Sequence, residues 1–219
     1  MNPTTNFTHP LDTVPGGAVP RSVTAEPVVI DGRSALRVSL TDEIAVRGTP
    51  GVDYVDQPTF LMLPVEFTDG VIEVDVRSRL AVGAPAYARG FAGVAYRISP
   101  DMDRFEAAYL RPLNGLKVAP PAPRDRRAVQ HFSYPDWPFD RLRETFPEGT
   151  FEAAANIGPD EWMHLRLDVD GAWCEVSVDG EPLLRVESGA QPGRGAVGLF
   201  VDIGTEAFFA DLTVRPAGR

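Results

Sequence analysis

Residues 161–186 read EWMHLRLDVDGAWCEVSVDGEPLLRV, and this stretch decides the fold class. Apolar side chains such as Leu165 and Leu167 occupy every second position, with polar residues between them. Alternation with a period of two is typical of a half-buried β-strand. Asp170-Gly171 interrupts the pattern as a signal for a two-residue hairpin turn. The stretch therefore predicts two antiparallel strands whose apolar side chains share one face.

The position of the turn also predicts the register of this hairpin. A loop formed by Asp170-Gly171 places Leu167 opposite Cys174 and Arg166 opposite Glu175. Apolar residues then pair on one face and opposite charges pair on the other, which stabilises a hairpin. A slip of one residue would expose the whole apolar set.

The next turn is expected to be a three-residue loop at 179–181, with Gly180 in the left-handed conformation. This loop pairs Val176 with Leu184 and Val178 with Pro182. A two-residue loop is the alternative, but it would place the charged Glu181 opposite Val178.

Similar alternation extends along most of the chain. The strand-like runs lie near residues 34–41, 60–67, 70–80, 90–98, 104–111, 127–133, 161–169, 172–178, 182–187, 195–202 and 206–215. So many antiparallel strands with short turns require two packed sheets. The one helical candidate is FDRLRET at 139–145. We expect an extended N-terminal segment over residues 1–30, packed on a single domain over 31–219.

Composition limits the classes of function. The chain has 219 residues, a net charge of −10, 20 glycines, 21 prolines and one cysteine. The acidic balance argues against nucleic acid and anionic lipid as partners, and no apolar run is long enough for a membrane span. One cysteine excludes a disulfide framework. Met1–Val19 has no basic and apolar signal pattern, so a cytoplasmic location is expected.

Several blocks of sequence resemble a known superfamily. They are GVIEVDVR, FAGVAYRI, RFEAAYLRP, RRAVQHFSYPDW, PDEWMHLRLDV, VSVDGEPLL, GAVGLFVD and FFADLTVRP, within about residues 60–216. Their order resembles the concanavalin A-like lectin/glucanase jelly rolls. Within these it is similar to laminin-G-like bacterial domains related to family 16 glycoside hydrolases and 3-keto-disaccharide hydrolases. The resemblance implies an all-β jelly-roll sandwich of two antiparallel sheets and a carbohydrate-active function.

The resemblance has two consequences for cofactors and catalysis. Jelly rolls of this type often carry a structural calcium ion, for which Asp101, Asp103, Asp202 or Asp211 are candidates; no other cofactor is expected. Family 16 glucanases carry Glu, Asp and Glu at alternate positions of one strand. In the strand-like run at 70–80 of this chain, the position of the third carboxylate is occupied by Arg77, which cannot act as a nucleophile or general acid. We therefore expect no family 16 chemistry on this strand.

The candidate catalytic residues lie elsewhere. Glu106 is the expected general acid/base. It lies in the strand-like run at 104–111, in which small residues separate large polar ones. A glycosidase needs a second carboxylate, for which Asp136 is the candidate. The alternative is a structural ion pair between Glu106 and Arg97. A shared open pocket for Glu106 and Asp136 would favour an enzyme, and a sealed Glu106 would favour a binding module.

Ligand binding is expected around a rigid aromatic turn, YPDWP at 134–138. An aromatic ring covers the apolar face of a sugar while planar polar groups bind its hydroxyls. The alternative is that these rings plug one end of the sandwich. The expected ligand-binding residues are Arg97, Tyr109, Arg111, Asn114, Arg127, Gln130, His131, Tyr134, Trp137 and Arg141.

Two functions remain open from the sequence. The first is a glycoside hydrolase-like or keto-sugar hydrolase or lyase-like enzyme acting on a small saccharide or glycoside. The second is a non-catalytic, lectin-like carbohydrate-binding module.

Overall fold

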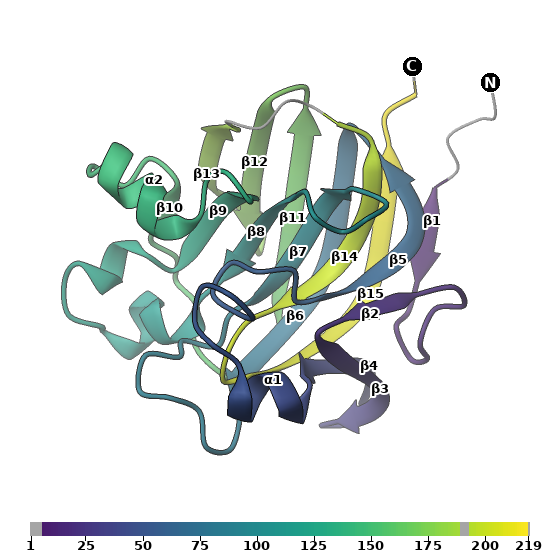
Figure 1. Ribbon diagram of the computed structural model, residues 1–219, viewed down its shortest axis with the longest axis horizontal. Helices are drawn as coiled ribbons and strands as arrows, with labels where there is room; N and C mark the ends of the chain where they lie inside the picture. Colours follow the sequence, from purple (N-terminus) through teal and green to yellow (C-terminus); the bar gives the residue numbers. More distant parts are fainter. Residues whose placement is uncertain (1–5, 189–192, 219) are drawn as a thin grey trace.

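The alternating runs form two antiparallel sheets in the computed structural model, which describes residues 6–188 and 193–218. In this described part the first sheet has eight strands, in the order β13 (Glu181–Glu187), β12 (Trp173–Val178), β11 (Met163–Asp170), β6 (Gly70–Leu80), β15 (Thr205–Pro216), β4 (Arg33–Leu40) and β3 (Val23–Ile30), with β1 (Phe7–His9) also paired to β15. The second has seven described strands, in the order β10 (Glu152–Ala153), β9 (Val129–Tyr134), β8 (Phe105–Leu110), β7 (Ala92–Ile98), β14 (Gly195–Val201), β5 (Phe60–Phe67) and β2 (Val19–Arg21). The sheets pack face to face (Figure 1), which confirms the expected jelly-roll sandwich.

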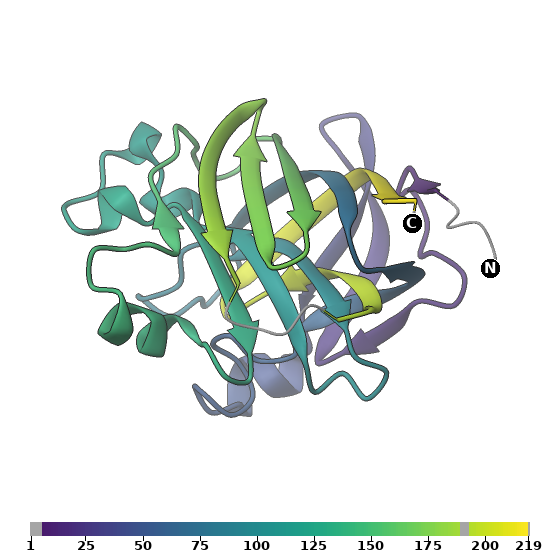
Figure 2. The same cartoon turned by 90° about the horizontal axis from the view of Figure 1, so that it is seen from above.

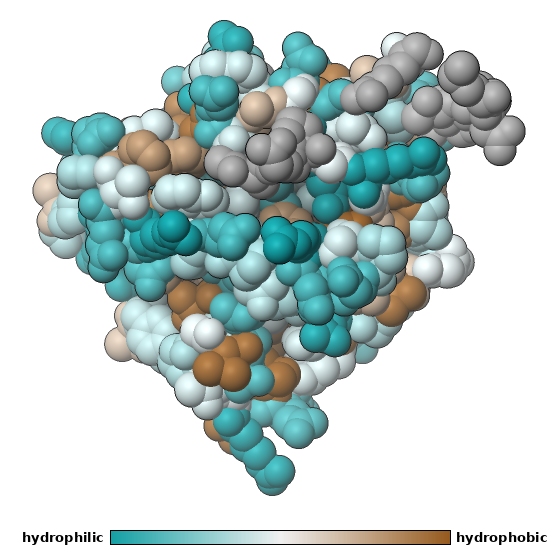
Figure 3. Space-filling view, turned by 45° about the horizontal axis from the view of Figure 1, so that its top comes forward, coloured by the Kyte–Doolittle hydropathy of each residue, from teal (hydrophilic) through white to brown (hydrophobic). Residues whose placement is uncertain are grey.

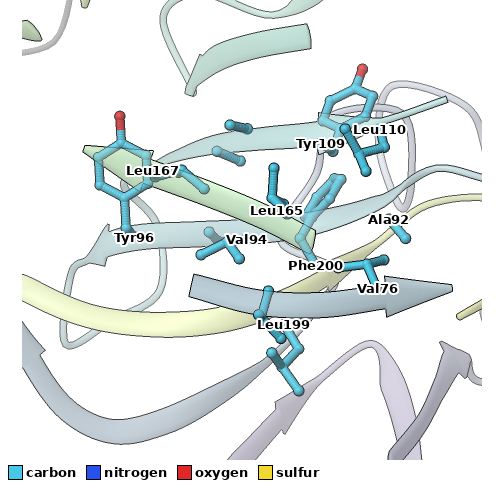
Figure 4. Close-up of a cluster of buried hydrophobic side chains, with 14 of the residues drawn as sticks. Val76, Ala92, Val94, Tyr96, Tyr109, Leu110, Leu165, Leu167, Leu199 and Phe200 are labelled. Atoms are coloured by element: carbon cyan, nitrogen blue, oxygen red, sulfur yellow. The ribbon is translucent and has the colours of Figure 1, made fainter. Parts of the chain in front are cut away.

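The core lies between these two sheets. In Figure 4, Leu165 and Leu167 of β11 belong to one buried cluster with Val94 of β7 and Leu199 of β14. All four side chains are fully buried. The alternation in the sequence therefore marks the inward face of β11, as expected.

The register of the β11–β12 hairpin differs from the prediction. Leu167 pairs with Val176 rather than with Cys174, and Asp170 pairs with Trp173. The two loop residues are therefore Gly171 and Ala172, with Gly171 at φ +57°, as a type II′ turn requires of its first central residue. The shift is two residues, so every side chain keeps its expected face, but the predicted Arg166–Glu175 pair is wrong.

The β12–β13 hairpin is partly as expected. Val176 pairs with Leu184, but Val178 pairs with Glu181 across a two-residue loop. Asp179 and Gly180 both have positive φ, at 52° and 83°, as a type I′ turn requires. A bulge between Val176 and Ser177 absorbs the extra residue, so the three-residue loop is wrong.

The first thirty residues contribute strands to both sheets. β3 pairs with β4 along its full length, β2 pairs with β5, and β1 pairs with β15. Leu11, which lies between β1 and β2 in the sequence, is fully buried. Residues 1–5 of the expected N-terminal segment lie outside the described residues.

The short helices gather at one end of the sandwich. α2 (Phe139–Thr145) forms where FDRLRET predicts it, and three 3-10 helices, η1 (Pro112–Asn114), η2 (Leu116–Val118) and η3 (Arg124–Arg126), follow β8. Figures 1 and 2 both show these elements at the end away from the chain termini. α1 (Asp42–Arg47) begins after Thr41, whose hydroxyl accepts the N–H of Ile44 at 3.4 Å.

The surface is largely polar on the side shown in Figure 3. Its apolar side chains form small groups separated by hydrophilic residues. A broad apolar patch is the usual mark of a protein-docking surface, and the described part of this face does not present one.

Candidate ligand-binding pocket

A cavity of about 280 Å³ opens among the loops at the helix-bearing end of the second sheet. Its walls come from the loop before β5, the β6–β7 loop, the end of β8, η1, η3, α2 and the β14–β15 turn. This volume is slightly below the usual range for ligand sites, about 300–1,000 Å³. We call this cavity the arginine pocket because Arg89, Arg111, Arg124, Arg127 and Arg143 line it.

Arg111 is the most buried of these arginines, with 3% of its surface exposed. It leaves the end of β8, and its backbone N–H donates to the carbonyl of Ala128 at 2.7 Å. One terminal nitrogen donates to Glu152 at 2.6 Å, and the other donates to Gln130 at 2.7 Å and to the Tyr109 hydroxyl at 2.9 Å. Burial lowers the pKa of Arg111, but Tyr109 and Glu152 outweigh it and raise the value. Arg111 is therefore a rigid, permanently charged wall of the pocket.

Two buried polar atoms in this wall have no hydrogen-bond partner. They are Nε of Arg111 and Oδ1 of Asn114. Asn114 is 4% exposed, and its Nδ2 donates to the carbonyl of Arg127 at 3.0 Å. An unpaired buried polar group costs about 1–3 kcal/mol. The pocket wall therefore holds one donor and one acceptor that have no hydrogen-bond partner among the described residues.

Glu152 neutralises one side of the arginine pocket. Its carboxylate lies 2.6 Å from a terminal nitrogen of Arg111, 2.6 Å from that of Arg143 and 3.4 Å from Nε of Arg127. Burial alone would raise the pKa of Glu152, but its bonds to Arg143 and Arg111 prevail and lower it. Glu152 is therefore ionised and compensates part of the charge of these three arginines.

Arg89 and Arg124 are different, because neither forms an ion pair with a carboxylate in the described part of the chain. Arg89 donates from one terminal nitrogen to the carbonyls of Ala86 at 2.8 Å and Ala88 at 2.6 Å. Burial lowers the pKa of Arg89, and the charges of Arg124 and Arg111 lower it further. The second side of the pocket therefore carries positive charge without an acidic partner.

Two aspartates, Asp202 and Asp56, line the wall of the pocket opposite the arginines. Asp202, after β14, accepts the N–H groups of Val55, Asp56 and Ile203 at 2.9, 3.0 and 2.6 Å. Val55 and Asp56 have positive φ values of 70° and 54°. A β-branched residue in this region is strained, and the strained turn directs both N–H groups at Asp202.

Asp56 is the titratable acid of this wall. It accepts the Tyr109 hydroxyl at 3.1 Å and the N–H of Phe139, the first residue of α2, at 2.6 Å. Burial and then the charge of Asp202 raise the pKa of Asp56 to about 7. Asp56 can therefore hold or release a proton near neutral pH.

The structure brings some of the expected ligand-binding residues together. Tyr109, Arg111, Asn114 and Arg127 line the arginine pocket. Gln130 lies behind it, where its amide oxygen accepts from Arg111. The sequence signal for Arg111 and Asn114 was RPLN at 111–114, a turn at the end of the strand-like run at 104–111.

Glu106 and Asp136 do not share this pocket. Glu106 is 2% exposed, and its carboxylate accepts from Arg97 at 2.8 Å and from the Tyr96 hydroxyl at 3.2 Å. Asp136 lies on an exposed turn, where it meets Arg104 at 3.4 Å. The expected pair of catalytic carboxylates is therefore separated, and the alternative, an Arg97–Glu106 ion pair, is what the structure contains.

The side of β8 that bears Glu106 faces the first sheet. Tyr96, paired with Glu106 in the strand register, contacts Cys174 of β12. His131 lies on the same side, with Nε2 2.8 Å from the Tyr96 hydroxyl, and burial lowers the pKa of His131 to about 4. Arg97 reaches this side because a bulge places it at φ +53°. Arg97 and His131 therefore belong to a buried polar cluster in the core.

The aromatic turn lies beside a second, smaller cavity. Tyr134 stacks on Phe105 with ring centres 5.2 Å apart, and Arg141 lies 4.4 Å above the ring of Trp137. Trp137 and His131 both line a cavity of about 80 Å³, together with Leu142 of α2. The aromatic turn therefore lies outside the arginine pocket.

Sequence reasoning missed several residues of the arginine pocket. They are Val55, Asp56, Tyr87, Arg89, Phe91, Arg124, Phe139 and Ile203, and Asp202 was expected only as a calcium ligand. The run RDRR at 124–127 is a basic cluster in an acidic chain and could have indicated Arg124. Asp56 gave no such signal, because its role depends on a turn that only packing creates.

The expected calcium ligands and the helices are the last features of the sequence to be placed. Within residues 6–188 and 193–218, no three His, Cys, Asp or Glu side chains form a group that could hold a metal ion. Of the expected calcium ligands, Asp101 bonds Ser99 in the β7–β8 turn, and Asp211 bonds Arg33 at 2.6 Å. No helix in the described part of the chain is both long and apolar enough to cross a bilayer.

Comparison with known proteins supports the fold. No protein-family model and no curated protein matches the sequence. Among solved structures, the carbohydrate-binding module CBM66 from Bacillus subtilis aligns with a TM-score of 0.55 and 13% identity, over 88% of this chain and 94% of that one. A protein of unknown function with a galectin-like fold, also from Bacillus subtilis, aligns with a TM-score of 0.58 and 13% identity, over 97% and 96%.

A third similar structure is a prokaryotic β-1,3-1,4-glucanase (lichenase) derived from a mouse hindgut metagenome. It aligns with a TM-score of 0.55 and 12% identity, over 97% of this chain and 100% of that one. The chain therefore shares the jelly-roll sandwich fold of these proteins, which is the fold that its sequence blocks indicate.

Proposed function

We propose that this chain binds a small saccharide in the arginine pocket and acts as a carbohydrate-binding jelly-roll protein. The observation that carries the proposal is the unsatisfied pair in the pocket wall, Nε of Arg111 and Oδ1 of Asn114. Sugar hydroxyls both donate and accept hydrogen bonds, so a saccharide can satisfy both atoms after a small adjustment of the wall.

The remaining walls also suit a sugar. Tyr87, Phe91, Tyr109 and Phe139 line the same cavity. Aromatic rings pack on the apolar C–H faces of sugar rings while polar groups fix their hydroxyls. The similarity in fold to a carbohydrate-binding module supports this proposal.

Binding without catalysis is favoured by the position of Glu106. Its carboxylate is held by Arg97 and Tyr96 in the core and does not line the pocket. A general acid must come within hydrogen-bond reach of the group that it protonates, which this position does not allow.

A hydrolase or lyase acting in the arginine pocket is the second candidate. The observation that favours it is Asp56, a buried carboxyl with a pKa of about 7 beside the Tyr109 hydroxyl. A group with this pKa near neutral pH is suited to general acid or base catalysis. Asp56, rather than Glu106, would then transfer the proton.

The experiment is a calorimetric titration of neutral and acidic mono- and oligosaccharides, followed by mass spectrometry of the recovered sugar. We expect saturable binding, an unchanged sugar and an affinity at least about tenfold lower for Asn114→Ala, equivalent to about 1.4 kcal/mol. Trp137→Ala is the matched control, because Trp137 lies outside the pocket.

Binding that is equal in Asn114→Ala and wild type, or no binding to any sugar, would overturn the proposal. A modified sugar that is not formed by Asp56→Asn would instead support the catalytic candidate.

A further inference from the structure

The charge of the arginine pocket is opposite to that of the whole chain. The chain has a net charge of −10, whereas five arginines and two aspartates line the described walls of the pocket. One of these aspartates, Asp56, is partly protonated at neutral pH. A positively charged cavity in an acidic protein attracts anions and does not repel a neutral ligand.

The positive charge is not evenly compensated. Glu152 bonds Arg111 and Arg143 and lies near Arg127. Arg89 and Arg124 have no such acid among the described residues, although both line the pocket. The uncompensated charge therefore lies between the β6–β7 loop, which carries Arg89, and η3, which carries Arg124.

Arg89 is also fixed in place. Its Nη1 bonds to the carbonyls of Ala86 and Ala88 hold the guanidinium. A guanidinium has five N–H donors, so Nε and Nη2 keep donors that no described group accepts. Guanidinium groups pair with carboxylate, sulfate and phosphate oxygens through two parallel bonds.

We infer that the saccharide taken by the arginine pocket is acidic, and that its anionic oxygens bind between Arg89 and Arg124. This inference rests on the proposed function and names the class of substrate. A sugar carboxylate and a sugar sulfate ester share this chemistry. The aromatic wall and Asn114 contact the sugar ring, and the two arginines select the charged substituent.

The crowding of like charges supports this arrangement. Arg124 and Arg111 both lower the pKa of Arg89, because a nearby like charge disfavours the charged form. An anion between Arg89 and Arg124 removes this repulsion and stabilises both guanidinium groups.

The test compares acidic sugars with neutral counterparts at constant ionic strength. The probes are galacturonate, glucuronate and their trisaccharides beside the corresponding methyl esters, galactose 6-sulfate beside galactose, and sodium sulfate alone. Dissociation constants are measured by calorimetry and by ligand-observed NMR. In wild type we expect at least one acidic probe to bind about tenfold or more tighter than its neutral counterpart.

The variants are Arg89→Ala, Arg124→Ala and the matched control Arg126→Ala. Arg126 is in the same 3-10 helix as Arg124, but it is exposed and does not line the pocket. We expect the preference for the charged sugar to disappear in Arg89→Ala and Arg124→Ala and to persist in Arg126→Ala. Arg124→Ala keeps the test valid if loss of the Arg89 carbonyl bonds disturbs folding.

The outcomes separate the two proposals. Equal binding of acidic and neutral sugars, or an equal loss of preference in Arg126→Ala, overturns the acidic-ligand inference and leaves saccharide binding standing. Binding of sulfate alone with no sugar overturns both. A uronate preference identifies a carboxylate, and a preference for galactose 6-sulfate identifies a sulfate ester.

Discussion

Among single residues, Asp56 shows how the fold changes the chemistry of a side chain. Its carboxylate accepts from Tyr109 and from the N–H of Phe139, and it lies beside Asp202, with Arg111 also near. Burial and the charge of Asp202 outweigh these favourable contacts, so the pKa of Asp56 rises to about 7. Ionised Asp56 therefore weakens the folded state.

The stability of the protein should depend on pH through Asp56. Its folded pKa is about 7 against an ordinary value of 3.8, so its contribution is fully present below about pH 4 and is lost as pH rises through 7. Asp56→Asn does not titrate. We expect it to gain stability relative to wild type as pH rises from 4 to 8, on the order of a few kcal/mol, since one pKa unit corresponds to about 1.4 kcal/mol.

Urea unfolding at pH 4, 6 and 8 measures this difference. Asp136→Asn, which removes one exposed carboxylate, is the control. A difference between Asp56→Asn and wild type that stays constant over this range would contradict the assignment of the raised pKa.

Among the elements, the β7–β8 pair positions the floor of the pocket. Gly93 of β7 lies directly opposite Tyr109 of β8. A Cβ atom at Gly93 would lie 2.2 Å from the carbonyl oxygen of Ala108 and 2.5 Å from Cα of Tyr109. Both are backbone atoms, so only a displacement of the strand could accommodate a side chain.

Gly93→Ala should therefore destabilise the protein and disturb the pocket. We expect a loss of about 1–3 kcal/mol, the usual cost of overpacking, and weaker ligand binding because Tyr109 moves with its strand. Gly16→Ala is the matched control, since no atom lies within 4 Å of its added Cβ. Thermal unfolding with calorimetric titration measures both effects, and equal melting temperatures for the two variants would refute the argument.

The β11–β12 hairpin shows which part of an element its sequence determines. Alternation correctly placed Leu165 and Leu167 on the inward face. The pairing shifted by two residues because Gly171, rather than Asp170, is the first loop residue. A shift of two leaves the faces unchanged, so the apolar pattern could not distinguish the two registers.

Across the whole molecule, the N-terminal residues close both sheets. β2 and β3 cover the edges of β5 and β4, and Leu11 and Val23 are buried in the core. β1 and β2 pair with β15 and β5, which lie far along the chain, whereas β3 pairs with the neighbouring β4. The short apolar pattern of residues 6–30 did not predict this role.

A chain that begins at residue 31 should be less stable than the full chain. Burying Leu11 and Val23 contributes about 1.5–3 kcal/mol each, and 1 kcal/mol shifts the melting temperature of a chain this size by about 2–4 °C. We therefore expect the melting temperature to fall by at least about 6 °C in circular dichroism. An unchanged melting temperature would show that residues 1–30 are not needed for the stability of the sandwich.

The sequence alone determined the class of fold and part of the site. Strand alternation and glycine turns depend on neighbouring residues, so they predicted the two-sheet sandwich, and the turn after β8 predicted Arg111 and Asn114. Only the tertiary structure decided which face of β8 meets the core, because both of its faces are buried. Packing therefore sealed Glu106 inside and brought Asp56, Arg89 and Arg124 together from loops whose positions no local pattern specifies.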